Sequence, residues 1–382
     1  MYLIKKFSFL CIFSALCLTI FAQNSSSPGC TSSFQLSQPA GSIPQLSRFN
    51  KVLDWNHDGI QDLVSMTSAG IPSIRFGKAD GGYFESVSSD YLSGIFSPIA
   101  MTVGYFDGDW IEGNFVANNR PDIAVATATG VYLLTTDDYG YFSFRGTPVM
   151  EQEVHALAAV DFNHDGFSDL MALDPDGGGY TALTNGYGGF YLPVSSRYTA
   201  NRWDENEYPA IISAGYFDGE FVNEKFTANQ SPDLAVLTNL GRVFLYTSDP
   251  YGYFSVREPS IIQTYKQIIA VDMNGDHASD LIGLDAEGKV WVLSNQGNRE
   301  FAATPATSAV SANLLIDGQD VDQDGNMDVA VSLKANGALA WLKQSTICAD
   351  VASRIIAGPR SRVTTSRNTL ITSELRTFTF RP

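Results

Sequence analysis

The chain is poor in the residues on which catalysis, nucleic-acid binding and membrane insertion usually depend. Its 382 residues include 4 histidines and 4 cysteines, and 24 lysines and arginines stand against 41 aspartates and glutamates, a net charge of −17. An acidic surface repels phosphate backbones, so we expect no nucleic-acid partner. Beyond residue 22 no apolar run reaches the length that spans a bilayer, and we expect no transmembrane segment.

Catalytic constellations are also missing from the sequence. His155 lies on an apolar segment, and the other histidines lie inside acidic loops: His57, His164 and His277. Gly188-Gly189 closes a turn instead of cradling a phosphate. Because every clustered carboxylate belongs to a loop pattern described below, we expect a protein that is not an enzyme. A polysaccharide lyase or glycosidase built on two carboxylates is the alternative.

Both ends of the chain differ from its middle. Lys5 and Lys6 precede an apolar stretch from residue 7 to residue 21, and Ala22 suits cleavage, so residues 1–22 are predicted to be a signal peptide. Such a peptide predicts a secreted, extracellular protein. Residues 351–382 are rich in Ser and Thr and contain six arginines, and we expect them to form a flexible basic tail. Residues 23–350 remain as the folded domain.

What the chain does contain is a repeated acidic loop. Four segments, beginning at Asp54, Asp161, Asp272 and Asp320, place Asp or Asn at positions 1, 3, 5 and 9. The loops that begin at Asp54, Asp161 and Asp320 have Gly at position 6, which permits a left-handed backbone. The loop that begins at Asp272 has His277 there. Hard oxygens at this density suit calcium better than zinc or copper. The alternative is that Asp, Asn and Gly occur there only because they favour turns. Four copies with the same spacing of oxygen-bearing side chains favour a bound ion.

The flanks of these loops exclude an EF-hand, which requires a Glu at position 12 and helices on both sides. Position 12 is apolar or small here, and each loop continues into a short apolar run that reads as a strand. Two disguised copies begin at Tyr105 and Tyr216 and carry insertions at residues 110–121 and 221–232. These insertions resemble each other, either because they form paired binding features or because a two-blade segment was duplicated.

The six loops begin 48 to 56 residues apart, which indicates a repeat protein of six units. Each unit contains short apolar runs separated by turn residues, with no helical periodicity, so the chain is predicted to be all-β. About fifty residues is the size of a four-stranded propeller blade. We therefore predict a six-bladed β-propeller, with seven blades as the alternative.

Each of the first five units has a second landmark, a phenylalanine 20 to 22 residues after the last Asp of its loop: Phe84, Phe142, Phe190, Phe254 and Phe301. The sixth unit lacks one, but Phe34 precedes the first loop at a matching distance. We infer that the N-terminal segment supplies the last strand of the sixth blade and closes the ring without an unpaired edge. Cys30 and Cys348 would then meet, and secretion favours a disulfide between them.

These motifs resemble the FG-GAP or VCBS repeats of integrin α-subunit head propellers, over about residues 30–348. In that family the acidic loop joins the first two strands of a blade and holds calcium. The resemblance implies these ligands, with a backbone carbonyl at position 7 completing each set: Asp54, Asn56, Asp58 and Asp62; Asp161, Asn163, Asp165 and Asp169; Asp272, Asn274, Asp276 and Asp280; and Asp320, Asp322, Asp324 and Asp328.

The second and fourth loops have each lost the ligand at position 1. Metal binding there would depend on Asp107, Asp109 and Asp122, or on Asp218, Glu220 and Asp233. By resemblance the protein is expected to be a monomeric, non-catalytic scaffold for extracellular recognition or cell adhesion, with a protein, matrix or glycan ligand. A lectin-like module that stacks sugars on its aromatic turns is the alternative.

Overall fold

Strand follows strand along the part of the chain that the computed structural model describes, which is residues 30–348 without 38–45, 48, 113, 119, 145, 201–202, 224 and 307–309. Its helices are two 3-10 turns, η1 (Asp90–Leu92) and η2 (Arg197–Thr199). The all-β prediction is therefore confirmed. Residues 32–346 form one compact unit, and a second unit comprises residues 1–31 and 347–382, of which only 30, 31, 347 and 348 are described.

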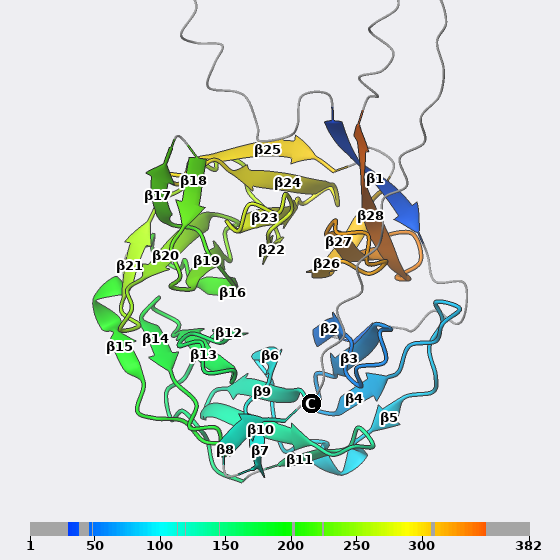
Figure 1. The fold of residues 1–382 in the computed structure, drawn as a ribbon. Helices are drawn as coiled ribbons and strands as arrows, with labels where there is room; N and C mark the ends of the chain where they lie inside the picture. Colours follow the sequence, from blue (N-terminus) through cyan, green and yellow to red (C-terminus); the bar gives the residue numbers. More distant parts are fainter. Residues whose placement is uncertain are drawn as a thin grey trace, which may run out of the picture. The chain divides into compact units, whose positions relative to one another are not determined.

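Six four-stranded sheets surround a common centre as the blades of a propeller, and the predicted six-bladed fold is confirmed (Figure 1). Blade 1 consists of β2 (Phe49–Leu53), β3 (Asp62–Met66), β4 (Pro72–Arg75) and β5 (Val87–Ser88). Blade 2 consists of β6 (Ala100–Gly104), β9 (Asp122–Thr127), β10 (Gly130–Thr136) and β11 (Phe142–Phe144). Blade 3 consists of β12 (Ala156–Val160), β13 (Asp169–Leu173), β14 (Gly179–Ala182) and β15 (Val194–Ser196).

Blade 4 consists of β16 (Pro209–Gly215), β19 (Asp233–Thr238), β20 (Val243–Ser248) and β21 (Phe254–Arg257). Blade 5 consists of β22 (Gln267–Val271), β23 (Asp280–Leu284), β24 (Val290–Asn295) and β25 (Phe301–Pro305). The sixth sheet has the order β1-β28-β27-β26, with β26 (Ala312–Gln319), β27 (Asp328–Leu333), β28 (Leu339–Cys348) and β1 (Cys30–Ser37). It therefore combines strands from both ends of the described chain.

The second strand of every blade is buried along its whole length. These strands, such as β3 and β9, lie inside a sheet that is covered by a neighbouring blade on each face. Burial on both faces explains why their sequences read as continuous apolar runs and not as alternating patterns. Figure 1 shows the first strand of each blade nearest the centre and the fourth at the rim.

Apolar clusters fill each boundary between neighbouring blades in the described structure. Between the sixth and first blades, Ile316 and Trp341 pack with Val52 and Leu63. Burying one such side chain stabilises the fold by about 1.5–3 kcal/mol. On the other side of the sixth blade, Phe34 of β1 packs against the cluster shared with blade 5.

The landmark aromatic of the first blade is Tyr83 and not the predicted Phe84. Tyr83 is buried and forms a β-bridge with Gly77, as Phe190 does with Thr184 in blade 3. Phe84 is 55% exposed. Tyr83 lies 21 residues after Asp62, just as Phe190 lies 21 residues after Asp169, so a tyrosine occupies the landmark position of blade 1. Phe84 is the next residue along the strand, and neighbouring residues of a strand point to opposite faces.

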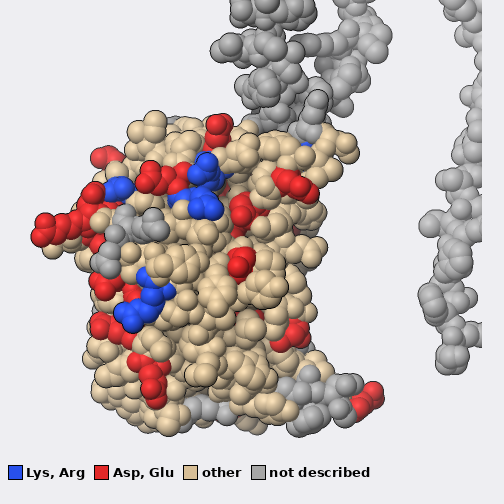
Figure 2. All heavy atoms as spheres, turned by 90° about the vertical axis from the view of Figure 1, so that its left-hand side faces the viewer, with Lys and Arg blue, Asp and Glu red and all other residues tan. Residues whose placement is uncertain are grey.

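The insertions of blades 2 and 4 fold as β-hairpins, β7 (Gly108–Ile111) with β8 (Asn114–Ala117), and β17 (Gly219–Val222) with β18 (Lys225–Ala228). Both hairpins occupy the place of the acidic loop between the first two strands. On the side of the ring nearest blades 3 and 4, basic side chains gather in small groups among more numerous acidic ones (Figure 2).

Candidate metal centres

The acidic loop of blade 3 is held by hydrogen bonds between its own carboxylates and its own backbone. Asp161 accepts the N–H groups of Asp165 at 3.1 Å and Gly166 at 2.9 Å. Asn163 Oδ1 accepts the same Asp165 N–H, and Asp165 Oδ1 accepts the N–H of Phe167. Each acidic or amide side chain therefore closes a turn two to five residues ahead of it. The ladder orients these oxygens toward the inside of the loop.

The same ladder recurs in blades 1, 5 and 6. Gly59 donates to Asp54, His277 to Asp272 and Gly325 to Asp320, at 2.8, 2.8 and 2.9 Å. His277 has φ +70°, so the backbone keeps its left-handed conformation although the sequence lacks Gly there. In the same loop, position 4 is occupied by Gly275, also left-handed at +73°. The replacement of the position-6 glycine by His277 therefore leaves the loop geometry intact.

Position 9 of the loop behaves differently from positions 1, 3 and 5, because its aspartate is fully buried at the start of the second strand. In blade 1, Asp62 Oδ2 accepts the Trp55 N–H at 2.9 Å and Oδ1 accepts the Gly77 N–H at 2.7 Å. One carboxylate thus ties the start of the loop to the end of the third strand. We call this pair of bonds the aspartate clamp.

The aspartate clamp is present in all six blades, with the same two oxygens in the same roles. Its carboxylates belong to Asp62, Asp122, Asp169, Asp233, Asp280 and Asp328. Their Oδ1 atoms accept backbone N–H groups from the third strand or from the second residue after it: Gly77, Thr136, Thr184, Ser248, Asn295 and Gln344. From the sequence these aspartates were predicted only as metal ligands. Their constant spacing of 14 to 16 residues from the third strand was the available signal.

Burial raises the pKa of the clamp carboxyls of Asp62, Asp169, Asp233, Asp280 and Asp328, although the backbone N–H donors oppose the shift. Desolvation raises the pKa of Asp62 to about 6 and those of Asp169 and Asp280 to about 7. Neighbouring loop carboxylates add to the rise, Asp58 for Asp62 and Asp165 for Asp169. A cation in the loop would favour the charged form and reverse this trend.

Carboxylates converge most closely in the loop of blade 6. One oxygen each from Asp320, Asp322 and Asp328 lie within 4.8 Å of one another, the only such group of three acidic, His or Cys side chains in the described residues. In the other three loops position 3 is Asn, so the same positions supply two carboxylates and an amide oxygen. This donor set, all oxygen and partly exposed, fits calcium. The side chains at positions 1, 3, 5 and 9 would be the ligands of such an ion. The carboxylate at position 9, which also forms the clamp, would bind it from the buried end of the loop.

The hairpin loops of blades 2 and 4 bring no three carboxylates together among the described residues, although the side chains of Asp218 and Asp233 are hydrogen-bonded in blade 4. Asp107 Oδ1 accepts the Asn118 amide at 2.5 Å, and Asp109 pairs with Arg120 at 3.5 Å. In blade 4, Asp218 accepts the Asn229 amide and Glu220 is exposed. Of the predicted ligands in these two loops, Asp122 and Asp233 hold the aspartate clamp. An asparagine therefore occupies the side of the site where the other loops place an acidic oxygen.

Several predictions lie outside the described residues. These are the signal peptide, the C-terminal tail and the side chains of Cys30 and Cys348, so the disulfide stays a prediction. Within the described part of the chain, no helix has both the length and the apolar character needed to cross a membrane.

The fold and its loops define the class of this protein as a six-bladed β-propeller with acidic inter-strand loops. No protein-family model and no curated protein matches the chain. A lectin from Agrocybe aegerita, described as recognising non-reducing terminal N-acetylglucosamine, is similar in structure at 15% identity and TM-score 0.48, over 68% of this chain and 66% of that lectin. The chain thus spans about two thirds of that lectin's length.

Two other solved structures are similar at the same level. The BP39L lectin of Burkholderia pseudomallei matches at 14% identity and TM-score 0.49, over 84% of each chain. BBS1N, solved in complex with ARL6DN, matches at 14% identity and TM-score 0.46, over 84% of this chain and 98% of its own. Likeness at this level carries no argument about function.

Proposed function

We propose that this protein is a secreted, non-catalytic β-propeller of the FG-GAP or VCBS kind that binds calcium in its acidic loops and recognises an extracellular ligand. The observation that carries the proposal is the hydrogen-bond ladder, in which the side chain of position 1 accepts the N–H groups of positions 5 and 6 in blades 1, 3, 5 and 6 alike. Four loops that orient the same oxygens in the same way are expected to hold the same ion.

Calcium would act as a structural ion in this arrangement. It would neutralise carboxylates that otherwise repel one another, and it would bind the folded loop in preference to the unfolded chain. Each site then stabilises the fold by about 2.7 kcal/mol when free calcium exceeds the dissociation constant a hundredfold. The carboxylates of the acidic loops take part in ladder bonds and clamps, which supports a scaffold role over catalysis.

The proposal is tested by calorimetric titration of the metal-free protein with calcium, beside thermal melting with and without EGTA. We expect four sites per chain and a melting temperature that falls on chelation. An identical melting curve in EGTA, together with no heat of calcium binding, would remove the metal from the proposal.

Glycan recognition is a second candidate, favoured by tyrosines in the turns between the third and fourth strands. Tyr139 and Tyr251 are 76% and 77% exposed, and Tyr187 and Tyr191 are exposed in blade 3. Exposed aromatic faces can stack on sugar rings. Glycan-array binding that requires calcium would favour this function, whereas binding only to matrix proteins would favour an adhesion role.

A further inference from the structure

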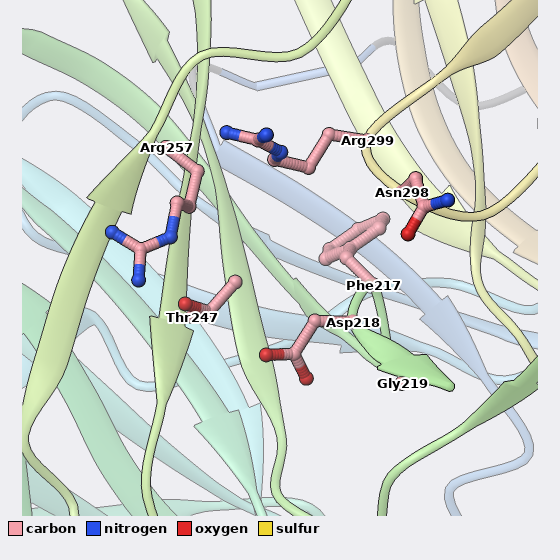
Figure 3. Close-up of a pocket in the computed structure, with 7 residues that line it drawn as sticks. All are labelled: Phe217, Asp218, Gly219, Thr247, Arg257, Asn298 and Arg299. Atoms are coloured by element: carbon pink, nitrogen blue, oxygen red, sulfur yellow. The ribbon is translucent and has the colours of Figure 1, made fainter.

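A pocket lies between blade 4 and the turn that joins β24 to β25 in blade 5. It has a volume of about 260 Å³, enough for one small ring compound. Its lining residues come from four places in the chain: Phe217, Asp218, Gly219, Thr247, Arg257, Asn298 and Arg299. Figure 3 shows the guanidinium groups of Arg257 and Arg299 on one side of the pocket, with Thr247 and the carboxylate of Asp218 on the other.

Neither arginine of the pocket forms an ion pair in the part of the chain that the structure describes. Arg120 and Arg242, by contrast, each pair with two carboxylates. Arg257 donates only to the backbone carbonyl of Val256, at 3.2 Å. Guanidinium groups bind carboxylates in a planar, two-bonded geometry, and two of them at one pocket form a site for an organic anion.

The backbone that presents Arg299 is strained. Gly297, Asn298 and Arg299 all have positive φ, at +80°, +50° and +70°. The equivalent position in the first four blades, two or three residues before the landmark aromatic, is a left-handed glycine: Gly81, Gly140, Gly188 and Gly252. An arginine there adopts a conformation that disfavours residues with a Cβ, and such strain is concentrated at functional sites.

The hairpin of blade 4 braces this turn. A Cβ added at Gly297 would lie 2.6 Å from the ring of Phe226 and 2.8 Å from that of Phe221, so the β17–β18 hairpin packs directly on the turn. The related boundary between blades 2 and 3 lacks the arginine. There Tyr187 and Gly188 replace Asn298 and Arg299, and Tyr187 forms a β-bridge with Asp107. The arginine that Arg299 contributes to the pocket is therefore not repeated at the boundary between blades 2 and 3.

We propose that this pocket binds the carboxylate group of an acidic saccharide, with Arg257 and Arg299 as its anion-binding residues. Asp218 disfavours a bare anion such as phosphate, but it can accept hydrogen bonds from sugar hydroxyls. Thr247 and Asn298 supply further polar groups beside it. The inference deepens the recognition role proposed above and rests on it, because it names the ligand class of one site on that propeller.

The test is a calorimetric titration of the calcium-loaded protein with D-glucuronate and with D-glucose, which differ in the carboxylate. We expect glucuronate to bind at least ten-fold more tightly than glucose, and more weakly as salt is raised. Arg257→Gln and Arg299→Gly should each weaken glucuronate binding at least ten-fold. Arg299→Gly restores the residue type of the other blades, so its melting temperature should not fall. Arg197→Gln, at an exposed arginine outside the pocket, is the matched control and should bind like the parent.

Equal binding of glucose and glucuronate, or equal losses in Arg197→Gln and Arg299→Gly, would overturn the assignment. Tighter binding of an amino acid such as glutamate would replace the saccharide with another class of ligand and would also overturn it. If EGTA lowers the melting temperature while glucuronate binds no better than glucose, the pocket assignment fails and the calcium-bound propeller stands. If glucuronate binds selectively and EGTA has no effect, the metal assignment fails and the pocket stands.

Discussion

Blades 1, 3, 5 and 6 join their first two strands by a nine-residue acidic loop, whereas blades 2 and 4 use a β-hairpin at the same place. Among the residues that the structure describes, the exposed ladder, in which position 1 accepts the N–H of position 6, is present only in the first group. The aspartate clamp is present in both, and Asp122 and Asp233 make the same two bonds as Asp62. The clamp is therefore a feature of every blade, whereas the ladder accompanies only the acidic loops of blades 1, 3, 5 and 6.

The difference also separates two kinds of acidic residue that look alike in sequence. Clamp aspartates are fully buried and bonded to backbone N–H groups far along the chain. Ladder aspartates are exposed or half-buried and bonded within a few residues. Removing the first kind should damage the blade with or without metal, and removing the second should matter only when metal is bound.

The largest effect is expected for Asp233→Ala in blade 4. The substitution leaves the N–H groups of Phe217 and Ser248 buried without their acceptor, which should destabilise the fold by about 2–5 kcal/mol. The loss should be the same in calcium and in EGTA, as measured by urea unfolding. Asp176→Ala, at an exposed aspartate, is the control and should stay within about 0.5 kcal/mol of the parent. An Asp233→Ala protein as stable as this control would refute the clamp.

A smaller, conditional effect is expected for Asp161→Ala in blade 3. With calcium present it should lose up to about 2.7 kcal/mol, the contribution of one saturated site. In EGTA it should unfold nearly like the parent, because the bonds it removes are exposed to water. Asp107→Ala in blade 2 should change stability equally in both conditions. If calcium dependence were lost in Asp107→Ala as well, the hairpin loops would also bind metal and the contrast between the two kinds of loop would disappear.

The smallest effect, counted for one carboxyl and one unit of pH, concerns the metal-free protein. Carboxyls whose pKa is raised on folding, to about 6 for Asp62 and about 7 for Asp169, contribute stability that is complete below their ordinary pKa of 3.8. This stability is lost as pH rises through the folded values. Unfolding in EGTA should therefore become easier between pH 4 and pH 7, by about 1.4 kcal/mol per pH unit for each proton released. Calcium should flatten or reverse the slope, and a metal-free protein that gains stability over this range would contradict the assignment.

Much of the fold could be predicted because it depends on local patterns that recur along the sequence. The interval of 48 to 56 residues, the short apolar runs and the loop register led to six blades and the positions of the second strands. The prediction of Phe84 as a landmark was wrong because Tyr83, and not a phenylalanine, occupies the buried position 21 residues after Asp62. Two aromatic residues are adjacent there, and the sequence alone does not show which of them faces the core.

The acidic loops were predictable for the same reason, since each ladder is formed within nine residues. The sequence also indicated the insertions of blades 2 and 4, but it did not indicate that they fold as hairpins or that Asn118 and Asn229 bond to Asp107 and Asp218. These bonds join residues that are eleven apart, across a hairpin whose strands carry no clear alternation.

The sequence by itself determined the all-β class, the six-fold repeat and the oxygen-rich loops, because these depend on residues that are close together in the chain. The aspartate clamp and the pocket of Arg257 and Arg299 were decided only by the tertiary structure. Asp218 and Arg299 are separated by 81 residues in the sequence and share one pocket because blade 4 packs against blade 5. Such proximity arises from the burial of apolar faces between whole sheets, which no local spacing records.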